Sequence, residues 1–486
     1  MTARRPALPP ARRVPTTTTI AYAAGAAAYG IKDSGFGTFL LLFYNQVIGV
    51  APGTVGLIIM AALVLDAFID PAVGALSDRT RGRWGRRHPW MYASALPIAI
   101  GWLLLWHPPH LSPALTCLWL FVTAVLVRSA VSCYEVPSQA LTPELTADYD
   151  ERTRITAWRY LLGWAGGLTM MLLAYRVFLA PRPGFPNGLL RGEGYGEMAI
   201  AGAALMIGAI LVSALGTHRE IGRLPRPALG RQTIAGHFRD LAETMKNRAF
   251  VVLMLAGLAA YTNQGISYAM ANYFYAYVWQ LSGWSLGLVP LVLMIGALAA
   301  FVAAPIIGRR TSKPRAAIVV TLAGVMIQTA PYILRLAGWF VAPDNPAFVP
   351  VYFLFVAGST AFNVCGFILG ASMMADVVEE SEARTGRRAE GVFFAGSFFV
   401  QKCTSGIGIF LAGAILALAG FPARATPGAV PVATIDRLTL IFVIPYLLLG
   451  VATALCFARF PFGRTEHEAR LARMAAAAGA EHASTA

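Results

Sequence analysis

The sequence predicts an all-α membrane protein with twelve transmembrane helices. Of its 486 residues, 57% are apolar and only 13% are charged, whereas soluble proteins average about 45–50% apolar and about 25% charged residues. The apolar residues gather in stretches of about 20 residues or more, the length that a helix needs to cross the hydrocarbon core of a bilayer. These two observations exclude a water-soluble enzyme and predict a polytopic protein of the lipid bilayer.

Twelve apolar stretches follow one another along the chain, and each is long enough to span a membrane. They cover residues 17–48, 53–76, 90–107, 113–141, 155–180, 195–216, 249–279, 284–307, 316–340, 348–374, 391–420 and 434–460. The first is too long for a cleaved signal peptide, so we expect it to remain as a membrane anchor. An even number of spans places both termini on the same side of the membrane.

The longest polar connection divides the twelve stretches into two groups of six. We therefore expect five parts: a tail at 1–16, a six-helix bundle at 17–216, a cytoplasmic linker at 217–248, a second six-helix bundle at 249–461 and a tail at 462–486. Within the linker, four apolar residues recur at helical spacing and predict a short helix on the membrane face: Ile234, Phe238, Leu241 and Met245.

The net charge of +15 would suit a nucleic-acid binder if the basic residues formed runs interleaved with aromatic residues. Instead, arginines occupy the short gaps between apolar stretches. Most lie in the two tails and in the loops that follow even-numbered spans. By the positive-inside rule, this distribution predicts cytoplasmic termini, and it argues against nucleic acid as a partner. We expect the membrane to be the inner (plasma) membrane of a bacterium.

Eight ionisable residues remain inside the predicted spans. They are Lys32, Asp33, Asp66, Asp70, Arg128, Glu135, Arg159 and Lys402. A charged residue at the centre of a transmembrane helix costs about 2.5–3.5 kcal/mol on insertion scales, so residues of this kind usually serve a function. Only four lysines occur in the whole chain, and two of them belong to this set.

Three of these carboxylates are spaced to share helix faces with one another or with a hydroxyl. Asp66 and Asp70 are separated by four residues, and Ser132 and Glu135 by three, so each pair lies on one face of its helix. Converging oxygens of this type suit a monovalent metal cation or a proton, whereas no cluster of histidines or cysteines offers softer ligands. The alternative is that these acids only pair with basic residues to hold the helices together.

The seventh span carries a polar and aromatic stripe that includes Tyr268 and Asn272. Amide and phenol groups facing a cavity could bind sugar hydroxyls, while aromatic rings stack on the sugar. Tyrosines near a helix end could equally form part of an interfacial aromatic belt. Both interpretations stay open at this point.

Four blocks of sequence carry a specific order of residues and are spread over nearly the whole chain. The first, residues 66–90, reads DAFIDPAVGALSDRTRGRWGRRHPW; the others are 135–154, 246–250 and 376–402. These blocks resemble the glycoside-pentoside-hexuronide:cation symporter family of the major facilitator superfamily, which includes melibiose permease. The resemblance implies a major facilitator fold, with two six-helix halves around a central cavity, and secondary active transport by alternating access.

The resemblance also implies roles for single residues. Asp66 and Asp70 match the family's paired cation-site aspartates, and Ser132 matches the hydroxyl residue that completes that site. Together with Glu135, these residues form the expected site for Na⁺ or H⁺, the monovalent cation that would be the coupling ion. No other cofactor is expected.

A sugar or glycoside is the substrate class that the resemblance implies. Asp33, Glu135 and Arg159 match the groups that hold the sugar, and Lys402 matches the lysine that couples the cation and sugar sites. Tyr268 and Asn272 are our additional candidates for substrate contacts. The expected partners are therefore a small-molecule substrate, the coupling cation and the lipid bilayer, with the protein acting as a monomer.

The basic loop after the second span resembles the superfamily's gating loop. There, Asp78, Arg79, Arg86 and Arg87 would pair with the ends of other helices in the outward-facing state. The same arginines also act as a positive-inside signal. The two roles are compatible, because topology depends only on the charge of the loop, whereas the gating role depends on the order of its residues.

Two alternatives remain beside sugar symport. Gln139 and Phe398 stand where melibiose permease has a tryptophan and a threonine, which argues against a galactoside and leaves a lysolipid or other amphiphile as a second substrate class. The remote alternative is a membrane-embedded prenyltransferase, because two aspartates at helical spacing, as at Asp66 and Asp70, can hold a magnesium diphosphate. We expect no enzymatic activity.

Overall fold

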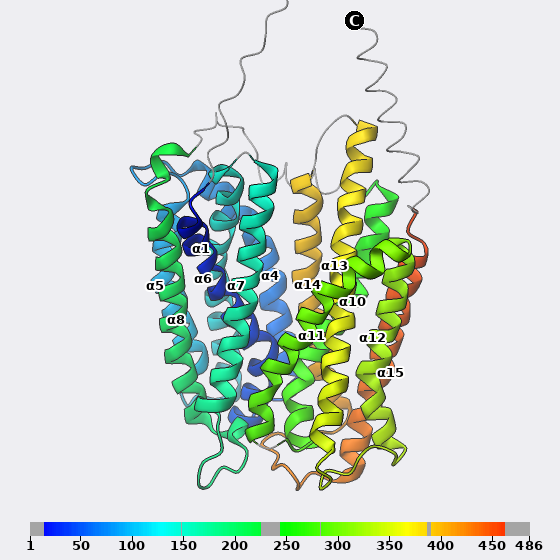
Figure 1. Ribbon diagram of the computed structural model, residues 1–486. Coiled ribbons are helices and arrows are strands. Elements are labelled where there is room, and N and C mark those ends of the chain that lie inside the picture. Colours follow the sequence, from blue (N-terminus) through cyan, green and yellow to red (C-terminus); the bar gives the residue numbers. More distant parts are fainter. Residues whose placement is uncertain (1–13, 147, 225–243, 282, 386–389, 462–486) are drawn as a thin grey trace, which may run out of the picture.

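The computed structural model describes residues 14–146, 148–224, 244–281, 283–385 and 390–461. Eleven helices within these ranges are long and apolar enough to cross a membrane (Figure 1). They are α4 (Pro52–Arg79), α5 (His88–Trp106), α6 (Pro113–Leu145), α7 (Tyr149–Leu173, continued by η3, Ala174–Phe178), α8 (Gly192–His218), α10 (Arg248–Tyr273, continued by η6, Phe274–Val278), α11 (Gly283–Arg310), α12 (Lys313–Leu336), α13 (Phe348–Thr385), α14 (Glu390–Leu418) and α15 (Val432–Ala458).

The remaining span is a helix built of five consecutive pieces. These are α1 (Thr16–Ala24), α2 (Ala26–Ser34), η1 (Gly35–Phe39), α3 (Leu40–Leu42) and η2 (Phe43–Ile48). η1 and η2 are π-helical, as are η3 and η6, and such segments often mark functional sites because they break the regular hydrogen-bond ladder. With this span, the described ranges hold twelve membrane-spanning helices, as predicted.

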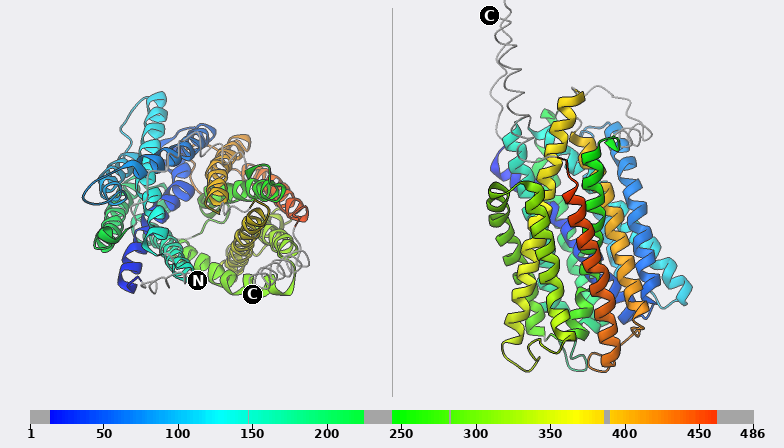
Figure 2. Two further views of the ribbon diagram at one scale, coloured as in Figure 1. Left: turned by 90° about the horizontal axis from the view of Figure 1, so that it is seen from above. Right: turned by 90° about the vertical axis from the view of Figure 1, so that its right-hand side faces the viewer.

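The helices form two bundles of six. One half contains α1 to α8 and the other α10 to α15, and a view along the helices separates the two groups (Figure 2). The beginning of α1 and the end of α15 lie at the same end of the molecule (Figure 1). This end also carries the arginine-rich loop after α4, and we call it the basic end; the other is the opposite end. The predicted layout of two six-helix halves is confirmed.

Several helices extend beyond the apolar stretches that predicted them. α6 continues to Leu145 through Pro137 and Pro143, and α13 reaches Thr385. The 33 residues of α6 span about 50 Å, against about 30 Å of hydrocarbon. Hydropathy identifies only the part of a helix that lies in lipid, so the polar ends of α6 and α13 were not predicted. Most of the predicted linker helix, including Ile234, lies outside the described residues.

Glycines on α14 let this helix pack closely on its neighbours. A Cβ atom added at Gly413 would lie 2.4 Å from the backbone oxygen of Pro52 on α4, and one added at Gly406 would lie 3.2 Å from the Leu63 Cβ. Small residues at helix contacts allow such close approach in membranes. The contact between α4 and α14 joins the two halves, and it places Lys402 opposite the two aspartates of α4.

We expect Gly408→Ala to destabilise the protein, because α10 and α14 meet at this glycine. An added Cβ would lie 2.4 Å from the Thr262 backbone oxygen, and overpacking of this kind costs about 1–3 kcal/mol. Thermal unfolding of the purified protein should show a lower Tm. Gly370→Ala is the matched control, since a Cβ there meets nothing within 4 Å; equal Tm values for the two variants would contradict this packing.

Candidate functional site

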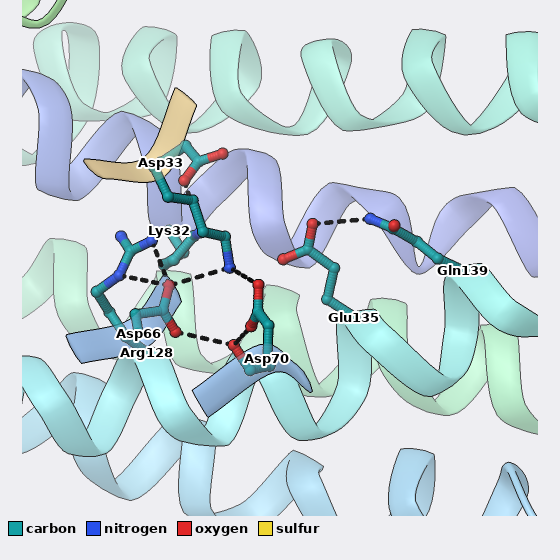
Figure 3. Close-up of polar contacts among 9 residues, drawn as sticks. Lys32, Asp33, Asp66, Asp70, Arg128, Glu135 and Gln139 are labelled. Atoms are coloured by element: carbon teal, nitrogen blue, oxygen red, sulfur yellow. Dashed lines mark hydrogen bonds and ion pairs between the residues drawn. The ribbon is translucent and has the colours of Figure 1, made fainter. Parts of the chain in front are cut away.

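Two carboxylates and a hydroxyl from the first half form the centre of the site. Asp66 and Asp70 project from one face of α4 toward α6 (Figure 3). The Ser132 hydroxyl lies 2.9 Å from Asp66 Oδ1 and 2.6 Å from Asp70 Oδ1. The structure therefore brings together three of the four residues predicted for the cation site.

Two basic side chains approach the same carboxylates from different halves. Arg128 of α6 donates to Asp66 Oδ2 through Nη2 at 2.7 Å and Nε at 3.0 Å. Lys402 of α14 lies 2.5 Å from Asp70 Oδ2 and 3.0 Å from Asp66 Oδ2. We call these five residues, Asp66, Asp70, Arg128, Ser132 and Lys402, the carboxylate cluster.

Burial differs within the carboxylate cluster. The side chains of Asp66 and Arg128 are only 2% and 4% exposed, whereas those of Asp70 and Lys402 are 26% and 19% exposed. The pair of Asp66 and Arg128 is thus enclosed by protein. The pair of Asp70 and Lys402 is open enough for a small ion to reach.

A second group of charged residues adjoins the carboxylate cluster. Asp33 on α2 is 61% exposed and pairs with Lys32 at 2.6 Å. Glu135 accepts a hydrogen bond of 3.0 Å from Gln139, one turn further along α6 (Figure 3). The hydrogen bond of Glu135 is thus made within α6, to Gln139, and its role as a cation ligand stays a prediction; we count Glu135 and Gln139 with this second group.

Arg159 lies buried beside this second group. Its Nη1 donates to the Ser138 hydroxyl at 2.8 Å, and its guanidinium lies over the Tyr22 ring at 4.7 Å. Glu135 is within electrostatic range of both Arg159 and Lys402. Charges in the two groups can therefore influence one another without direct contact.

The two candidates on the seventh span have different surroundings. Tyr268 is 43% exposed and lies within electrostatic range of Asp33, as expected for a residue facing a substrate. Asn272 is fully buried: it accepts a hydrogen bond of 2.7 Å from Tyr175 and donates one of 3.0 Å to the Thr38 carbonyl. In this conformation the Asn272 amide is engaged within the protein, because helical spacing predicts a residue's face and not its depth. A substrate contact by Asn272 stays a prediction.

Asn272 belongs to a layer of buried polar contacts that closes the two halves at the opposite end. Tyr273 donates to Asn45 at 2.9 Å, and Tyr277 donates to Gln46 at 3.0 Å. Gln46 also accepts from the Ala425 backbone at 2.8 Å. We call these residues, with Thr38, Tyr175 and Asn272, the closing layer. Its helices reach the contact through π-helical segments.

We expect Asn272→Ala to weaken the closing layer. The change leaves the Tyr175 hydroxyl and the Thr38 carbonyl buried without their amide partner, a loss of about 1–3 kcal/mol for each unsatisfied group. Spin labels at the exposed loop positions Phe185 and Trp339, in a background without native cysteines, should then report a new population at longer distance. An unchanged distance distribution would show that Asn272 does not hold the layer closed.

Three of the four predicted gating residues, Asp78, Arg86 and Arg87, form a network at the basic end. Arg87 pairs with Asp78 at 2.6 Å and with Glu144 at 3.0 Å, and Arg86 pairs with Glu144 at 2.7 Å. These bonds tie the end of α4 and the loop after it to the end of α6. Arg79 is exposed. The gating role itself stays a prediction.

Arg128 is a residue of the site that has no predicted role. A signal was available, because Arg128, Ser132 and Glu135 are spaced by four and three residues and so lie on one face of α6. Lys32 is likewise one of the eight ionisable residues within the predicted spans and has no predicted role. The free-energy cost of a charge inside a membrane span singles out both residues in the sequence. Only the fold identifies their partners.

Comparison with known proteins places this geometry in a family. The family model described as MFS/sugar transport protein matches residues 21–464. An uncharacterized symporter of Synechocystis is 28% identical, over 87% of this chain and 89% of its own. The isoprimeverose transporter of Lactiplantibacillus pentosus is 25% identical, over 85% and 82%.

A solved structure has the same fold. The crystal structure of a D-xylose–proton symporter superposes with a TM-score of 0.63 at 12% identity, covering 92% of this chain and 97% of that one. The match extends over both six-helix halves. The family is one of transporters, which argues against the prenyltransferase alternative. The chain is an integral membrane protein that belongs to the MFS/sugar transport family, among the glycoside-pentoside-hexuronide:cation symporters of the major facilitator superfamily.

Proposed function

We propose that the protein is a secondary active transporter that carries a sugar or glycoside together with a monovalent cation, Na⁺ or H⁺. The observation that carries this proposal is the position of Lys402, which contributes a positive charge from the second half to two carboxylates of the first half. A cation that replaces the Lys402 ammonium at these carboxylates would remove a contact between the halves. Ion binding is thereby linked to the movement of one half against the other.

Coupling follows from the charges of the two groups. When the cation binds at the carboxylate cluster, Lys402 loses part of its attraction to that cluster and is free to interact with Glu135 and the substrate. Each ligand then improves the site of the other, which is the thermodynamic requirement for coupling. The halves rock about the central site once both ligands are bound.

A polar substrate suits the second group. The exposed carboxylate of Asp33 and the side chains of Glu135 and Gln139 offer hydrogen-bond acceptors and donors to sugar hydroxyls. Tyr268, close to Asp33, presents an aromatic face on which a sugar ring could stack. We assign Arg159 to positioning, because its contacts hold Ser138 and Tyr22 within the first half.

We infer that the basic end faces the cytoplasm of a bacterial cell, with both termini there, because arginines concentrate at that end. The closing layer then lies on the outer side of the inner membrane. The described conformation is accordingly inward-facing, with the halves joined on the outer side by the closing layer. In this conformation Asp78, Arg86 and Arg87 pair with one another and with Glu144 inside the first half; we expect them to pair with the ends of other helices in the outward-facing state.

Uptake into membrane vesicles tests the proposal. Labelled glycosides, pentoses and hexuronates, with lysophosphatidylcholine as a comparison, would be offered with and without an imposed sodium or proton gradient. We expect gradient-stimulated uptake of at least one sugar, and loss of the stimulation on addition of an ionophore. Stimulated uptake of the lysolipid alone would favour the amphiphile alternative, and no stimulated uptake of any compound would contradict symport.

The Asp70→Asn variant links that uptake to the site. Removing this charge should abolish the stimulation by the gradient, because Lys402 loses its nearest partner and the ion loses its ligand. Asp344→Asn is the matched control, since Asp344 is exposed in the loop between α12 and α13. Equal stimulation in both variants would place the ion site elsewhere.

A further inference from the structure

We propose that Arg128 is a tethered cation that permanently occupies Asp66, so that the coupling ion has only the charge of Asp70 available. This inference rests on the proposed symport function and specifies its ion site. It assigns a specificity-determining role to Arg128, whose side chain forms the most enclosed ion pair of the site.

One oxygen of Asp66, Oδ2, is fully used. A carboxylate oxygen has about two lone-pair positions, and Oδ2 receives three contacts, from Nη2 and Nε of Arg128 and from Nζ of Lys402, whereas Oδ1 has one, from the Ser132 hydroxyl. Arg128 supplies two of these. Sodium, a hard cation, needs several oxygen ligands around it. Oδ2 of Asp66 cannot serve as one while the guanidinium stays, and the negative charge of this carboxylate is already met by Arg128.

Arg128 stays when the halves rock, because its partners belong to its own half. Asp66 on α4 and Arg128 on α6 lie in helices that pack together within the first bundle. The guanidinium is also held over the Phe36 ring, 5.4 Å from its centroid. Lys402 differs in that it comes from α14 of the second half, so its bonds change with every movement between the halves.

The charge balance leaves room for one exchangeable cation. Asp66 and Asp70 together carry two negative charges, and Arg128 neutralises one of them throughout. The other is met by Lys402 in the described conformation and by one monovalent ion when Lys402 withdraws. Without Arg128, the two aspartates and Ser132 would present a doubly negative oxygen site of the type that favours sodium.

Direct binding of radioactive sodium to the purified protein tests this inference. We expect the wild type to bind sodium weakly and Arg128→Ala to bind it at least about tenfold more tightly. Adding Asp66→Asn to Arg128→Ala should remove the gain, because the freed carboxylate supplies it. Arg128→Lys retains the charge and should behave like the wild type.

Two results would overturn the inference: tight sodium binding by the wild type that Asp66→Asn abolishes, or a folded Arg128→Ala protein that binds sodium no better than the wild type. Size-exclusion chromatography establishes folding, and Arg128→Gln replaces Arg128→Ala if the alanine variant aggregates. The binding measurement needs no substrate. A negative binding result would therefore contradict the role of Arg128 and not the proposed symport. A negative uptake result would contradict symport and would not affect the sodium-binding result.

Discussion

Replacement of Lys402 by alanine is expected to abolish accumulation of substrate against its concentration gradient. Lys402 supplies the positive charge that the second half places on Asp70, at 2.5 Å, and on Asp66, at 3.0 Å. Without it, the first half carries an unbalanced carboxylate whether or not the halves have moved. Ion occupancy then no longer controls the contact between the halves, and the two gradients are uncoupled.

The measurement is steady-state accumulation of labelled substrate in proteoliposomes with an imposed ion gradient. We expect the Lys402→Ala protein to reach only the external concentration, at any gradient. Lys246→Ala is the matched control, because Lys246 is exposed before α10 and distant from the site. Concentrative uptake by Lys402→Ala at the level of Lys246→Ala would contradict the assigned role.

Asp66→Ala is expected to cause the largest loss of stability among substitutions in the site. Asp66 is 2% exposed and its partner Arg128 is 4% exposed. The substitution therefore leaves the Arg128 guanidinium buried in the first half without its carboxylate partner. Removing one member of a buried ion pair costs about 3–5 kcal/mol. For a protein of this size, that loss corresponds to a fall in Tm of about 3–5 °C.

Thermal unfolding of the purified protein measures this loss. Asp436→Ala serves as the control, because Asp436 pairs with Arg335 at 2.7 Å but is 44% exposed, and exposed pairs contribute about 0–1 kcal/mol. Adding Arg128→Met to Asp66→Ala should recover part of the Tm by removing the stranded charge. Similar Tm values for Asp66→Ala and Asp436→Ala would show that the pair with Arg128 is not a buried ion pair.

The fold was predictable from the sequence because lipid imposes simple rules. Apolar stretches of spanning length identified all twelve helices, and the long polar connection separated the halves. The extra turns of α6 to Leu145 and of α13 to Thr385 were not predicted, since hydropathy says nothing of helix outside lipid. The π-helical turns, such as η1 at Gly35–Phe39, were missed for a different reason: they keep the apolar composition of a regular helix.

The site was predictable as a set of residues and not as a set of contacts. Spacing placed Asp66 and Asp70 on one face, and the cost of a buried charge singled out Lys402. Asp66 pairs with Arg128 as well as with Lys402. This contact depends on how α6 is rotated against α4, which is set by helix packing and cannot be read from spacing. Asn272 illustrates the same limit, because its helix face was predicted while its depth in the closing layer was not.

Ion movement driven by substrate is the most direct test of the central claim that ion and sugar share one transport step. Proteoliposomes with equal ion concentrations inside and outside would receive substrate on one side only, and ion entry would be followed with radioactive sodium and a pH-sensitive dye. We predict that the substrate gradient alone drives one of the two ions inward, and that Lys402→Ala abolishes this flux. Substrate entry with no accompanying ion movement would contradict coupling at the carboxylate cluster.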